Sequence, residues 1–184
     1  MWLIDKTFEF DYGHRVWTQK LNSDFSIDNR CVCRHLHGHR GKVHVYLKSD
    51  TLDETGMVTD FKHLNWFKKF LDDVLDHKMI LDMDDPTLFL LYSLATEHYL
   101  IENKEFNYYT VDIAKLETDL GDTFTDAEME LYEGLVIVNF VPTSENLAKW
   151  LAEITSKKMK EMGVNVSHIE FFETPKSRST YYID

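Results

Sequence analysis

Residues 31–39 read Cys-Val-Cys-Arg-His-Leu-His-Gly-His and hold both cysteines and three of the nine histidines of a 184-residue chain. This density of metal-ligating side chains predicts a metal-centred active site. Side chains alternate in a strand, so His37 and His39 project from one face, and Gly38 leaves room for a close approach. That face continues through the small and apolar residues Gly41, Val43, Val45 and Leu47. We therefore predict a strand over 37–48 that begins with two inward-facing histidines.

A third histidine ends the first apolar segment. Aromatic residues at positions 8, 10 and 12 alternate with polar or small ones up to His14, which predicts a strand over 2–12 with His14 ending its apolar row. Neutral imidazoles suit Zn²⁺, and a catalytic zinc takes three protein ligands and leaves a fourth position open. His14 is the candidate for the third ligand beside His37 and His39. Packing as ordinary histidines is the alternative.

The composition limits the class of protein. With 43% hydrophobic and 14% aromatic residues, the chain can build a core, and we predict a single domain over 1–184. A net charge of −12 argues against nucleic acid as a partner. Cysteines two positions apart do not readily close a disulfide, which favours a reducing compartment. No leader-like or membrane-spanning run occurs, so we expect a cytoplasmic protein without a membrane partner.

Helix and strand signals divide the rest of the chain. After a polar loop over 13–36, a helix with apolar residues at helical spacing follows 56–61, capped by Thr59 or Asp60. Thr143 can cap a second long helix that stops at Gly163. The run 135–141 is a predicted buried strand. Two more strands are expected over 164–173, with Asn165, Ser167, Ile169, Phe171 and Glu173 in one phase, and over 179–183.

Two further features are a candidate catalytic dipeptide and a long inserted segment. Asp76 precedes His77, and a carboxylate beside an imidazole can orient and charge-stabilise the ring, although most such dipeptides lie on surfaces without a role. Residues 84–134 form a predicted insertion, mainly helical, with one helix around 88–95 and a capping box at 125–128. We expect this insertion to pack on the outside and leave the catalytic residues untouched.

Taken together, these motifs resemble those of the 6-pyruvoyl-tetrahydropterin synthase and 6-carboxy-5,6,7,8-tetrahydropterin synthase family. The motifs that carry the resemblance occur in the family's order and cover most of the chain outside 84–134. They are Phe8-x-Phe10-x-x-x-His14, Cys33-x-x-Leu36-His37-Gly38-His39, Gly56-Met57-Val58-x-Asp60-Phe61, Leu75-Asp76-His77, Pro142-Thr143-Ser144-Glu145-Asn146-Leu147-Ala148 and Phe172-Glu173-Thr174. The departures are the insertion and the run Asp11-Tyr12-Gly13 before His14.

The resemblance implies an α+β tunnelling fold, in which two helices cover one face of an antiparallel four-stranded sheet. It also implies homohexamers, built as dimers of trimers, with active sites at subunit interfaces. Carried over by motif, the zinc ligands are His14, His37 and His39, and the base is Cys33. The relay pair is Asp76 and His77, and the pterin anchor is Glu173, with Thr143 also on the substrate.

The implied activity is that of a zinc-dependent lyase, 6-carboxy-5,6,7,8-tetrahydropterin synthase. It would convert 7,8-dihydroneopterin triphosphate to 6-carboxytetrahydropterin, acetaldehyde and triphosphate in 7-deazaguanine (queuosine and preQ0) biosynthesis. One alternative is the 6-pyruvoyl-tetrahydropterin synthase activity. Another is a non-catalytic module whose Cys31, Cys33, His37 and His39 close a structural zinc site. Cys33 is favoured as the base, because it lies four residues before His37 as in the carboxy-forming enzymes, whereas Cys31 lies six before, as in the pyruvoyl-forming enzymes.

Overall fold

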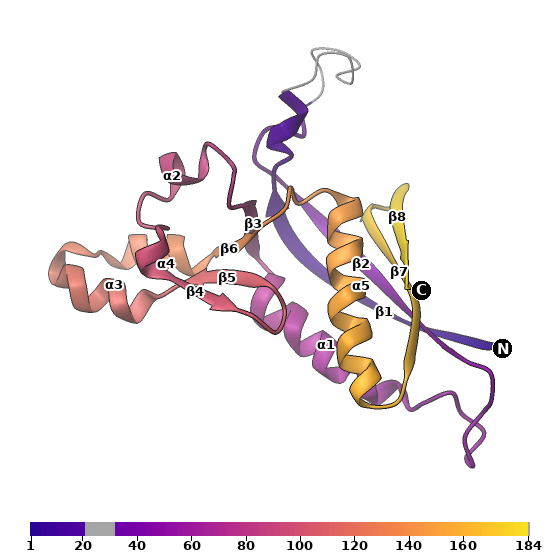
Figure 1. The fold of residues 1–184 in the computed structure, drawn as a ribbon. Coiled ribbons are helices and arrows are strands. Elements are labelled where there is room, and N and C mark those ends of the chain that lie inside the picture. The colour runs from indigo at the N-terminus through magenta and orange to yellow at the C-terminus, as the bar shows by residue number, and fades with distance from the viewer. Residues whose placement is uncertain (21–31, 184) are drawn as a thin grey trace. The chain divides into compact units, whose positions relative to one another are not determined.

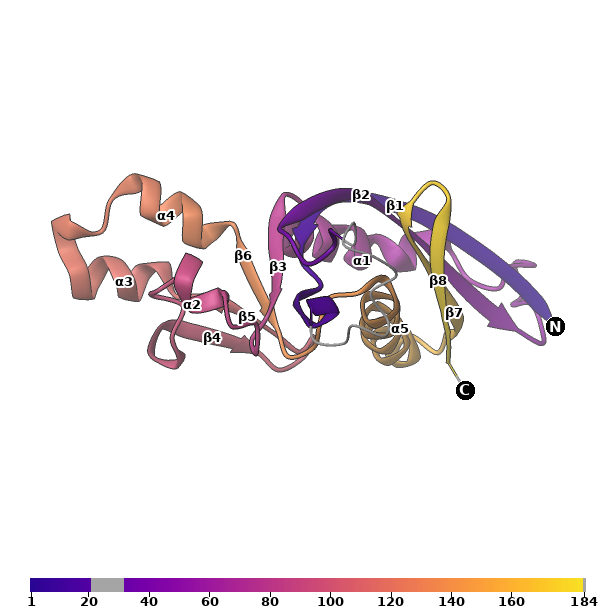
Figure 2. The same cartoon turned by 90° about the horizontal axis from the view of Figure 1, so that it is seen from above.

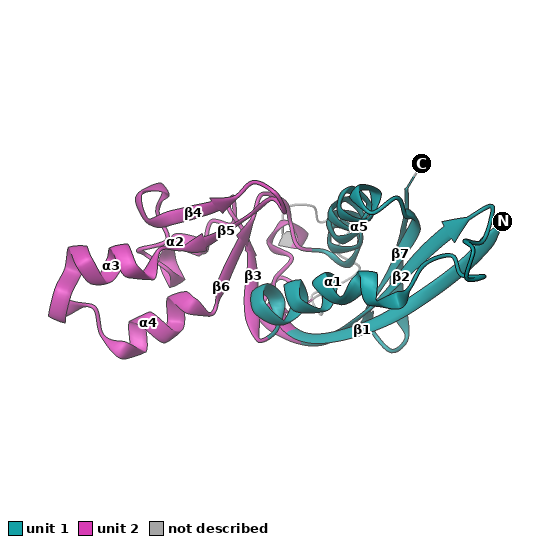
Figure 3. Ribbon diagram, turned by 90° about the horizontal axis from the view of Figure 1, so that it is seen from below, with its two compact units in different colours: residues 1–11, 39–76, 143–184 teal, residues 12–38, 77–142 magenta. Residues whose placement is uncertain are grey.

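The structure is a computed structural model that describes residues 1–20 and 32–183. It divides into two compact units, the first made of residues 1–11, 39–76 and 143–184 and the second of residues 12–38 and 77–142 (Figure 3). The strands β1 (Trp2–His14) and β2 (His37–Ser49) each contribute to both units. None of the helices in the described part of the chain combines the length and apolar character needed to cross a membrane.

The first unit has the expected strand and helix pattern. Its other strands are β7 (Asn165–Thr174) and β8 (Ser177–Tyr182), and β7 pairs antiparallel with both β2 and β8 (Figure 1). Its long helix is α5 (Ser144–Glu161), which packs on β7 and β8. Figure 2 shows α5 and the shorter α1 (Asn65–Phe70) on one side of these strands. The predicted placement of two helices on one face is therefore found.

Sequence periodicity explains why this unit packs as it does. Phe8, Phe10 and Tyr12 of β1 are buried, and in β2 the buried positions Gly41, Val43, Val45 and Leu47 alternate with half-buried ones. The predicted inward faces of both strands are thus confirmed. Aromatic rings continue the core into the helices, since Phe8 meets Phe67 edge-on at a centroid distance of 5.0 Å.

The predicted phase of β7 is wrong over its first part. Val43, Val45 and Leu47 pair with Phe171, Ile169 and Val166, so the register slips by one residue between Tyr46 and Leu47. A β-bulge of this kind reverses the face on which the preceding side chains lie. Asn165 is consequently exposed and Val166 buried, so Val166 rather than Asn165 shares the inward face with Ile169 and Phe171.

The helix after residues 56–61 has three parts. A 3-10 turn (Phe61–Leu64) capped by Asp60 leads into α1, and a π-helical turn (Leu71–Leu75) ends the run directly before Asp76. The Asp60 side chain accepts a hydrogen bond from the backbone N–H of Lys62 at 2.8 Å, so the predicted cap is confirmed. The π turn was not predicted, and such turns often mark functional sites.

Besides the end of β1 and the start of β2, the described part of the second unit contains four strands and three α-helices. The strands are β3 (Lys78–Asp82), β4 (Leu100–Asn103), β5 (Tyr108–Val111) and β6 (Leu135–Val138). The helices are α2 (Leu88–Leu91), α3 (Ile113–Leu120) and α4 (Asp126–Glu133). Short 3-10 turns cover Trp17–Lys20, Glu97–Tyr99 and Gly121–Thr123. The predicted capping box opens α4, because the Thr125 and Glu128 side chains bond each other's backbone N–H groups.

The sheet has more strands than the four expected. Its hydrogen-bonded order is β4-β5-β6-β3-β1-β2-β7-β8, so the expected strands β1, β2, β7 and β8 form one run. The end of β1 pairs parallel with β3, and β3 pairs parallel with β6, the strand predicted near 135–141. The insertion adds the β4–β5 hairpin. It is therefore helical for the greater part but not only helical.

Candidate metal centre and active site

His14 is the last residue of β1 and is fully buried. Its Nδ1 lies 2.6 Å from the backbone carbonyl oxygen of Pro142. A carbonyl can only accept, so Nδ1 carries the proton and Nε2 carries the lone pair of the neutral ring. Metal-binding histidines are typically held in this way, by a hydrogen bond from the other ring nitrogen.

His37, the first residue of β2, has the same arrangement. Its Nδ1 donates to the backbone carbonyl oxygen of His35 at 2.7 Å, which again leaves the lone pair on Nε2. The Nε2 atoms of His14 and His37 lie 3.1 Å apart. Two lone pairs at this separation repel each other unless a cation or a proton lies between them. The pair is therefore preorganised for a shared cation.

His39 completes the group two residues further along β2. One ring nitrogen from each of His14, His37 and His39 can be chosen so that all lie within 4.8 Å of one another. Tetrahedral zinc ligands at about 2.0–2.1 Å from the metal are roughly 3.3 Å apart, so three imidazoles at these separations fit Zn²⁺ after small side-chain rotations. The absence of a side chain at Gly38 allows β2 to lie close to the end of β1, since a Cβ at this position would lie 3.1 Å from the Tyr12 carbonyl oxygen.

Cys33 is half-buried with a free thiol, in the turn that precedes β2. Its backbone carbonyl accepts a hydrogen bond from the N–H of Val16 at 2.8 Å, which ties this turn to the residues that follow His14. Cys33 does not belong to the histidine group found among the described residues. Cys31, the other candidate base, lies outside the described residues.

Asp76 and His77 follow the π-helical turn. The Asp76 carboxylate accepts a hydrogen bond from the backbone N–H of Asp11 in β1 at 2.8 Å, so its position is set by a strand. His77 has a φ of 60°, in the left-handed region that a residue with a Cβ rarely adopts. Strain of this kind collects at functional sites. His77 is exposed and Asp76 is half-buried, so the catalytic role of the dipeptide stays a prediction.

Glu173 lies near the end of β7, with its carboxylate 3.8 Å from the Nε2 of His39. Glu173 thus contacts the histidine group through its side chain. Its side chain is about a quarter exposed, so a ligand can reach it. A carboxylate here can accept hydrogen bonds from a ligand held beside the metal position.

Thr143 is the N-cap residue directly before α5 and is half-buried. Its hydroxyl oxygen accepts a hydrogen bond from the backbone N–H of Asn146 at 3.2 Å, so the predicted helix cap is confirmed. The hydroxyl proton is not used in that bond and can be donated to another acceptor. Capping and substrate binding are therefore compatible at this residue.

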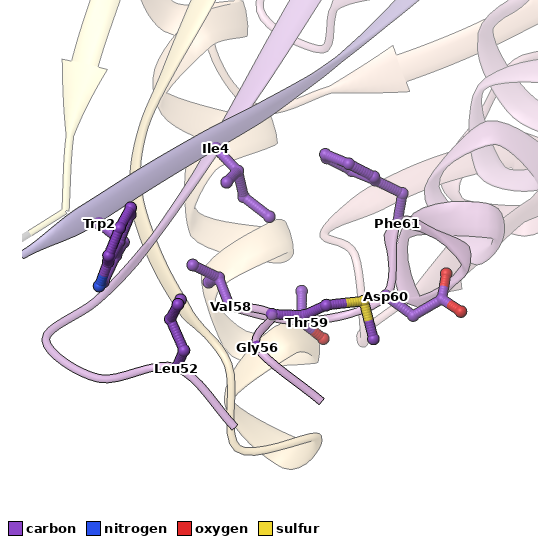
Figure 4. A pocket seen from close by; sticks show the side chains of 9 residues that line it. Trp2, Ile4, Leu52, Gly56, Val58, Thr59, Asp60 and Phe61 are labelled. Carbon is purple, nitrogen blue, oxygen red and sulfur yellow. The ribbon is translucent and has the colours of Figure 1, made fainter. Parts of the chain in front are cut away.

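An apolar pocket of about 360 Å³ lies elsewhere in the first unit (Figure 4). It is lined by the start of β1 and by the family motif at 56–61, with Trp2, Ile4, Leu52 and Phe61 contributing its largest side chains. None of the predicted catalytic, metal-binding or substrate-binding residues lines it.

Two groups that shape the histidine site were not predicted. They are the backbone carbonyls of Pro142 and His35, which set the protonated nitrogen of His14 and of His37. Every residue has a backbone carbonyl, so the sequence cannot show which carbonyl accepts a hydrogen bond from a given histidine. Only the fold shows this. His35 belongs to the histidine-rich run 31–39, but the atom that holds His37 is its backbone carbonyl oxygen and not a side-chain atom.

Comparison with known proteins identifies relatives over the full length. The family model for 6-pyruvoyl tetrahydropterin synthase matches residues 3–184. The 6-carboxy-5,6,7,8-tetrahydropterin synthase of Aquifex aeolicus is 31% identical over 191 residues, which cover 98% of this chain and 97% of that protein.

Solved structures agree with this result. An uncharacterised protein from Wolinella succinogenes is 50% identical, with a TM-score of 0.88 over 100% of this chain and 98% of that one. The 6-pyruvoyl tetrahydropterin synthase of Caenorhabditis elegans shares the fold, with a TM-score of 0.56 at 20% identity over 100% of this chain and 96% of that one. The chain therefore belongs to the 6-pyruvoyl tetrahydropterin synthase family.

Proposed function

We propose that the chain is a zinc-dependent 6-carboxy-5,6,7,8-tetrahydropterin synthase that acts in 7-deazaguanine biosynthesis. The observation that carries the proposal is the histidine group, in which two backbone carbonyls direct the lone pairs of His14 and His37 toward one point. The Aquifex relative, which matches over nearly the whole of both chains, bears that name. The 3.8 Å contact of Glu173 with His39 adds an anchor for substrate beside the metal position.

Each predicted site residue then has its own role in the proposed reaction. Zinc, when bound to His14, His37 and His39, supplies a Lewis acid for the oxygens of the substrate side chain and so acidifies the neighbouring carbon–hydrogen bonds. Cys33 accepts a proton, and Asp76 with His77 relays protons. Glu173 accepts two parallel hydrogen bonds from the amino group and a ring N–H of the pterin, which fixes the ring's orientation.

The test is to incubate the purified protein with 7,8-dihydroneopterin triphosphate and identify the pterin product by mass. We expect 6-carboxytetrahydropterin together with acetaldehyde and triphosphate. Formation of 6-pyruvoyl-tetrahydropterin as the main product would instead favour the other branch of the family. If no pterin is converted by the zinc-loaded protein, the proposal fails.

Replacement of Glu173 by glutamine tests the anchor. Glutamine keeps the size of the side chain but replaces one acceptor oxygen with a donor, which opposes a pterin N–H. A lost bond to a charged group costs about 1.5–3 kcal/mol, so we expect kcat/KM to fall roughly 10- to 150-fold. Zinc content should stay at the wild-type level. Glu161→Gln, an exposed position at the end of α5, is the matched control. An unchanged kcat/KM in Glu173→Gln would refute the anchoring role.

Replacement of Thr143 by alanine separates its two roles. Loss of the cap should lower the free energy of unfolding by about 0.5–2 kcal/mol, measured by urea denaturation. If the hydroxyl also binds substrate, KM should rise in this variant. Thr143→Asn can keep the cap without the hydroxyl, so it should restore stability but not KM. A wild-type KM in both variants would leave Thr143 with the structural role alone.

We also propose that the protein assembles as a hexamer built from two trimers. Strand β8 lies at an edge of the sheet, where its backbone can pair with another chain. The side chains of Trp2, Leu3 and Phe61 are about half exposed, which suits burial by another copy. Light scattering on the purified protein would measure the mass of the assembly.

A further inference from the structure

We propose that Asp85, Asp82 and Thr87 are positioning residues, which hold Arg15–Trp17 and, through this segment, the turn that carries Cys33. The proposal rests on the proposed function for the role of Cys33, and on the contacts below for everything else. All of these residues belong to the second unit.

The first anchor is the Arg15 side chain. Its Nη1 donates to the hydroxyl of Thr87 at 2.7 Å, and its Nε lies 3.1 Å from the carboxylate of Asp85. The second contact is an ion pair rather than an aligned hydrogen bond, since neither atom has a hydrogen-bond partner among the described residues. The Asp85 side chain is fully buried and that of Arg15 is 14% exposed. Loss of one partner from a buried pair leaves an uncompensated charge, so the arrangement is strongly specified.

Asp85 is itself held in place. Its other carboxylate oxygen accepts hydrogen bonds from both the backbone N–H and the hydroxyl of Thr87, at 2.8 and 2.9 Å. The Thr87 hydroxyl thus donates to Asp85 and accepts from Arg15. The three side chains form one connected network, and a change in any member disturbs the other two.

The second anchor lies two residues along. The indole N–H of Trp17 donates to the buried carboxylate of Asp82 at 2.7 Å. Asp82 is the last residue of β3, the strand that pairs with β1 up to His14. Arg15 and Trp17 are therefore both fixed to residues 82–87.

Val16, between these anchors, makes the connection to Cys33. Its backbone N–H donates to the Cys33 carbonyl at 2.8 Å. The residue before Arg15 is His14, whose ring faces His37. The segment thus starts at a predicted zinc ligand, is clamped on both sides of Val16, and bonds the predicted base through Val16. We call the contacts of Arg15 with Asp85 and Thr87, and of Trp17 with Asp82, the clamp. A shift of the clamp would move Cys33 relative to the histidines.

We expected 84–134 to leave the catalytic residues untouched, and the segment instead contacts Arg15, the neighbour of the predicted zinc ligand His14. Asp85 and Thr87 belong to that segment and contact Arg15 directly. The insertion therefore contributes to the support of the site, although none of the predicted catalytic residues lies in it.

The test uses Asp85→Asn, with Asp84→Asn as the matched control, because Asp84 is the exposed neighbour and undergoes the same change of charge. Misplacement by about 1 Å can cost on the order of 100-fold in rate, so we expect Asp85→Asn to lower kcat about 10- to 100-fold. KM and zinc content should change little by comparison, whereas the melting temperature should fall, because the variant leaves the largely buried Arg15 charge without its partner. Asp84→Asn should match the wild type.

A second readout does not depend on turnover. In a Cys31→Ser background, the rate at which iodoacetamide alkylates Cys33 reports its exposure. Release of the clamp should make alkylation several-fold faster in Asp85→Asn and leave it unchanged in Asp84→Asn. If the wild type converts no pterin, the proposed function fails, and the alkylation rates still decide the positioning role.

If Asp85→Asn does not fold, Trp17→Phe tests the same proposal, because this substitution removes only one hydrogen bond and keeps an aromatic ring. It should show the same two changes to a smaller extent. Wild-type kcat and alkylation rates in the folded variants would overturn the proposal. So would a loss of activity that only follows the loss of zinc or of folded protein, with an unchanged alkylation rate in the folded fraction.

Discussion

Replacement of Cys33 by alanine is expected to lower turnover by about 10²- to 10⁴-fold, the range that general-base catalysis typically contributes. The spacing of four residues to His37 matches the carboxy-forming branch of the family. Cys33 is half-buried with a free thiol, and its turn is held by the Val16 hydrogen bond. Because Cys33 lies outside the histidine group, the variant should keep its zinc. Steady-state kinetics and metal analysis on the same preparation measure both effects.

Cys31→Ala is the matched control and should retain nearly wild-type activity, because Cys31 is then a spare thiol. The opposite result, with Cys31→Ala inactive and Cys33→Ala active, would reverse the assignment of the base. If 6-pyruvoyl-tetrahydropterin were also the main product, the proposed function would be wrong as well. The pair of variants therefore tests the base and the branch of the family together.

The parts of the fold that could be predicted are those whose sequence has a strong hydrophobic periodicity. Alternation predicted the inward rows of β1 and β2, and the structure has a buried row that ends at His14 and another from Gly41 to Leu47, preceded by the half-buried His37 and His39. The caps at Asp60, Thr125 and Thr143 were also predicted, because a cap needs only a short side chain next to a helix start. These features depend on residues close together in the sequence.

The unpredicted parts depend on partners far away in the sequence. β3 is five residues long and is stabilised as a strand by its parallel neighbours β1 and β6, which no local pattern reveals. The bulge in β7 likewise arises from its pairing with β2. Residues 108–111 are rich in aromatic and β-branched side chains, so β5 could have been expected from its composition.

The insertion was expected to be separable from the rest, and its core argues against this. Most of one hydrophobic cluster comes from 84–134, including Leu88, Leu116 and Tyr132, and it packs on Leu81 of β3 and Ile137 of β6. Removal of the segment would expose these strands as well as release Arg15. This core and the Arg15 contacts therefore argue against the prediction that turnover survives replacement of 84–134 by a short linker, which stays untested.

Replacement of His37 by alanine is expected to abolish stoichiometric zinc binding, and turnover with it. Changes to groups around a metal ligand typically cost 10- to 100-fold in affinity, and loss of a ligand from a three-histidine site should cost more than that. The wild type should hold one zinc per subunit, measured by elemental analysis after dialysis. Zinc should also raise the melting temperature of the wild-type apoprotein, because a ligand that binds only the folded state stabilises it, and this shift should vanish in the variant.

His35→Ala is the matched control for the zinc measurement. It removes an exposed imidazole two residues away but keeps the carbonyl that fixes the His37 ring, so zinc binding should persist. The pair therefore separates a ligand from a neighbour that contributes only its backbone. If Cys31→Ser or Cys33→Ser also lost its zinc, the cysteines would be ligands, and the structural-zinc alternative would replace the catalytic one. Zinc retained at the wild-type level in His37→Ala would contradict both sites.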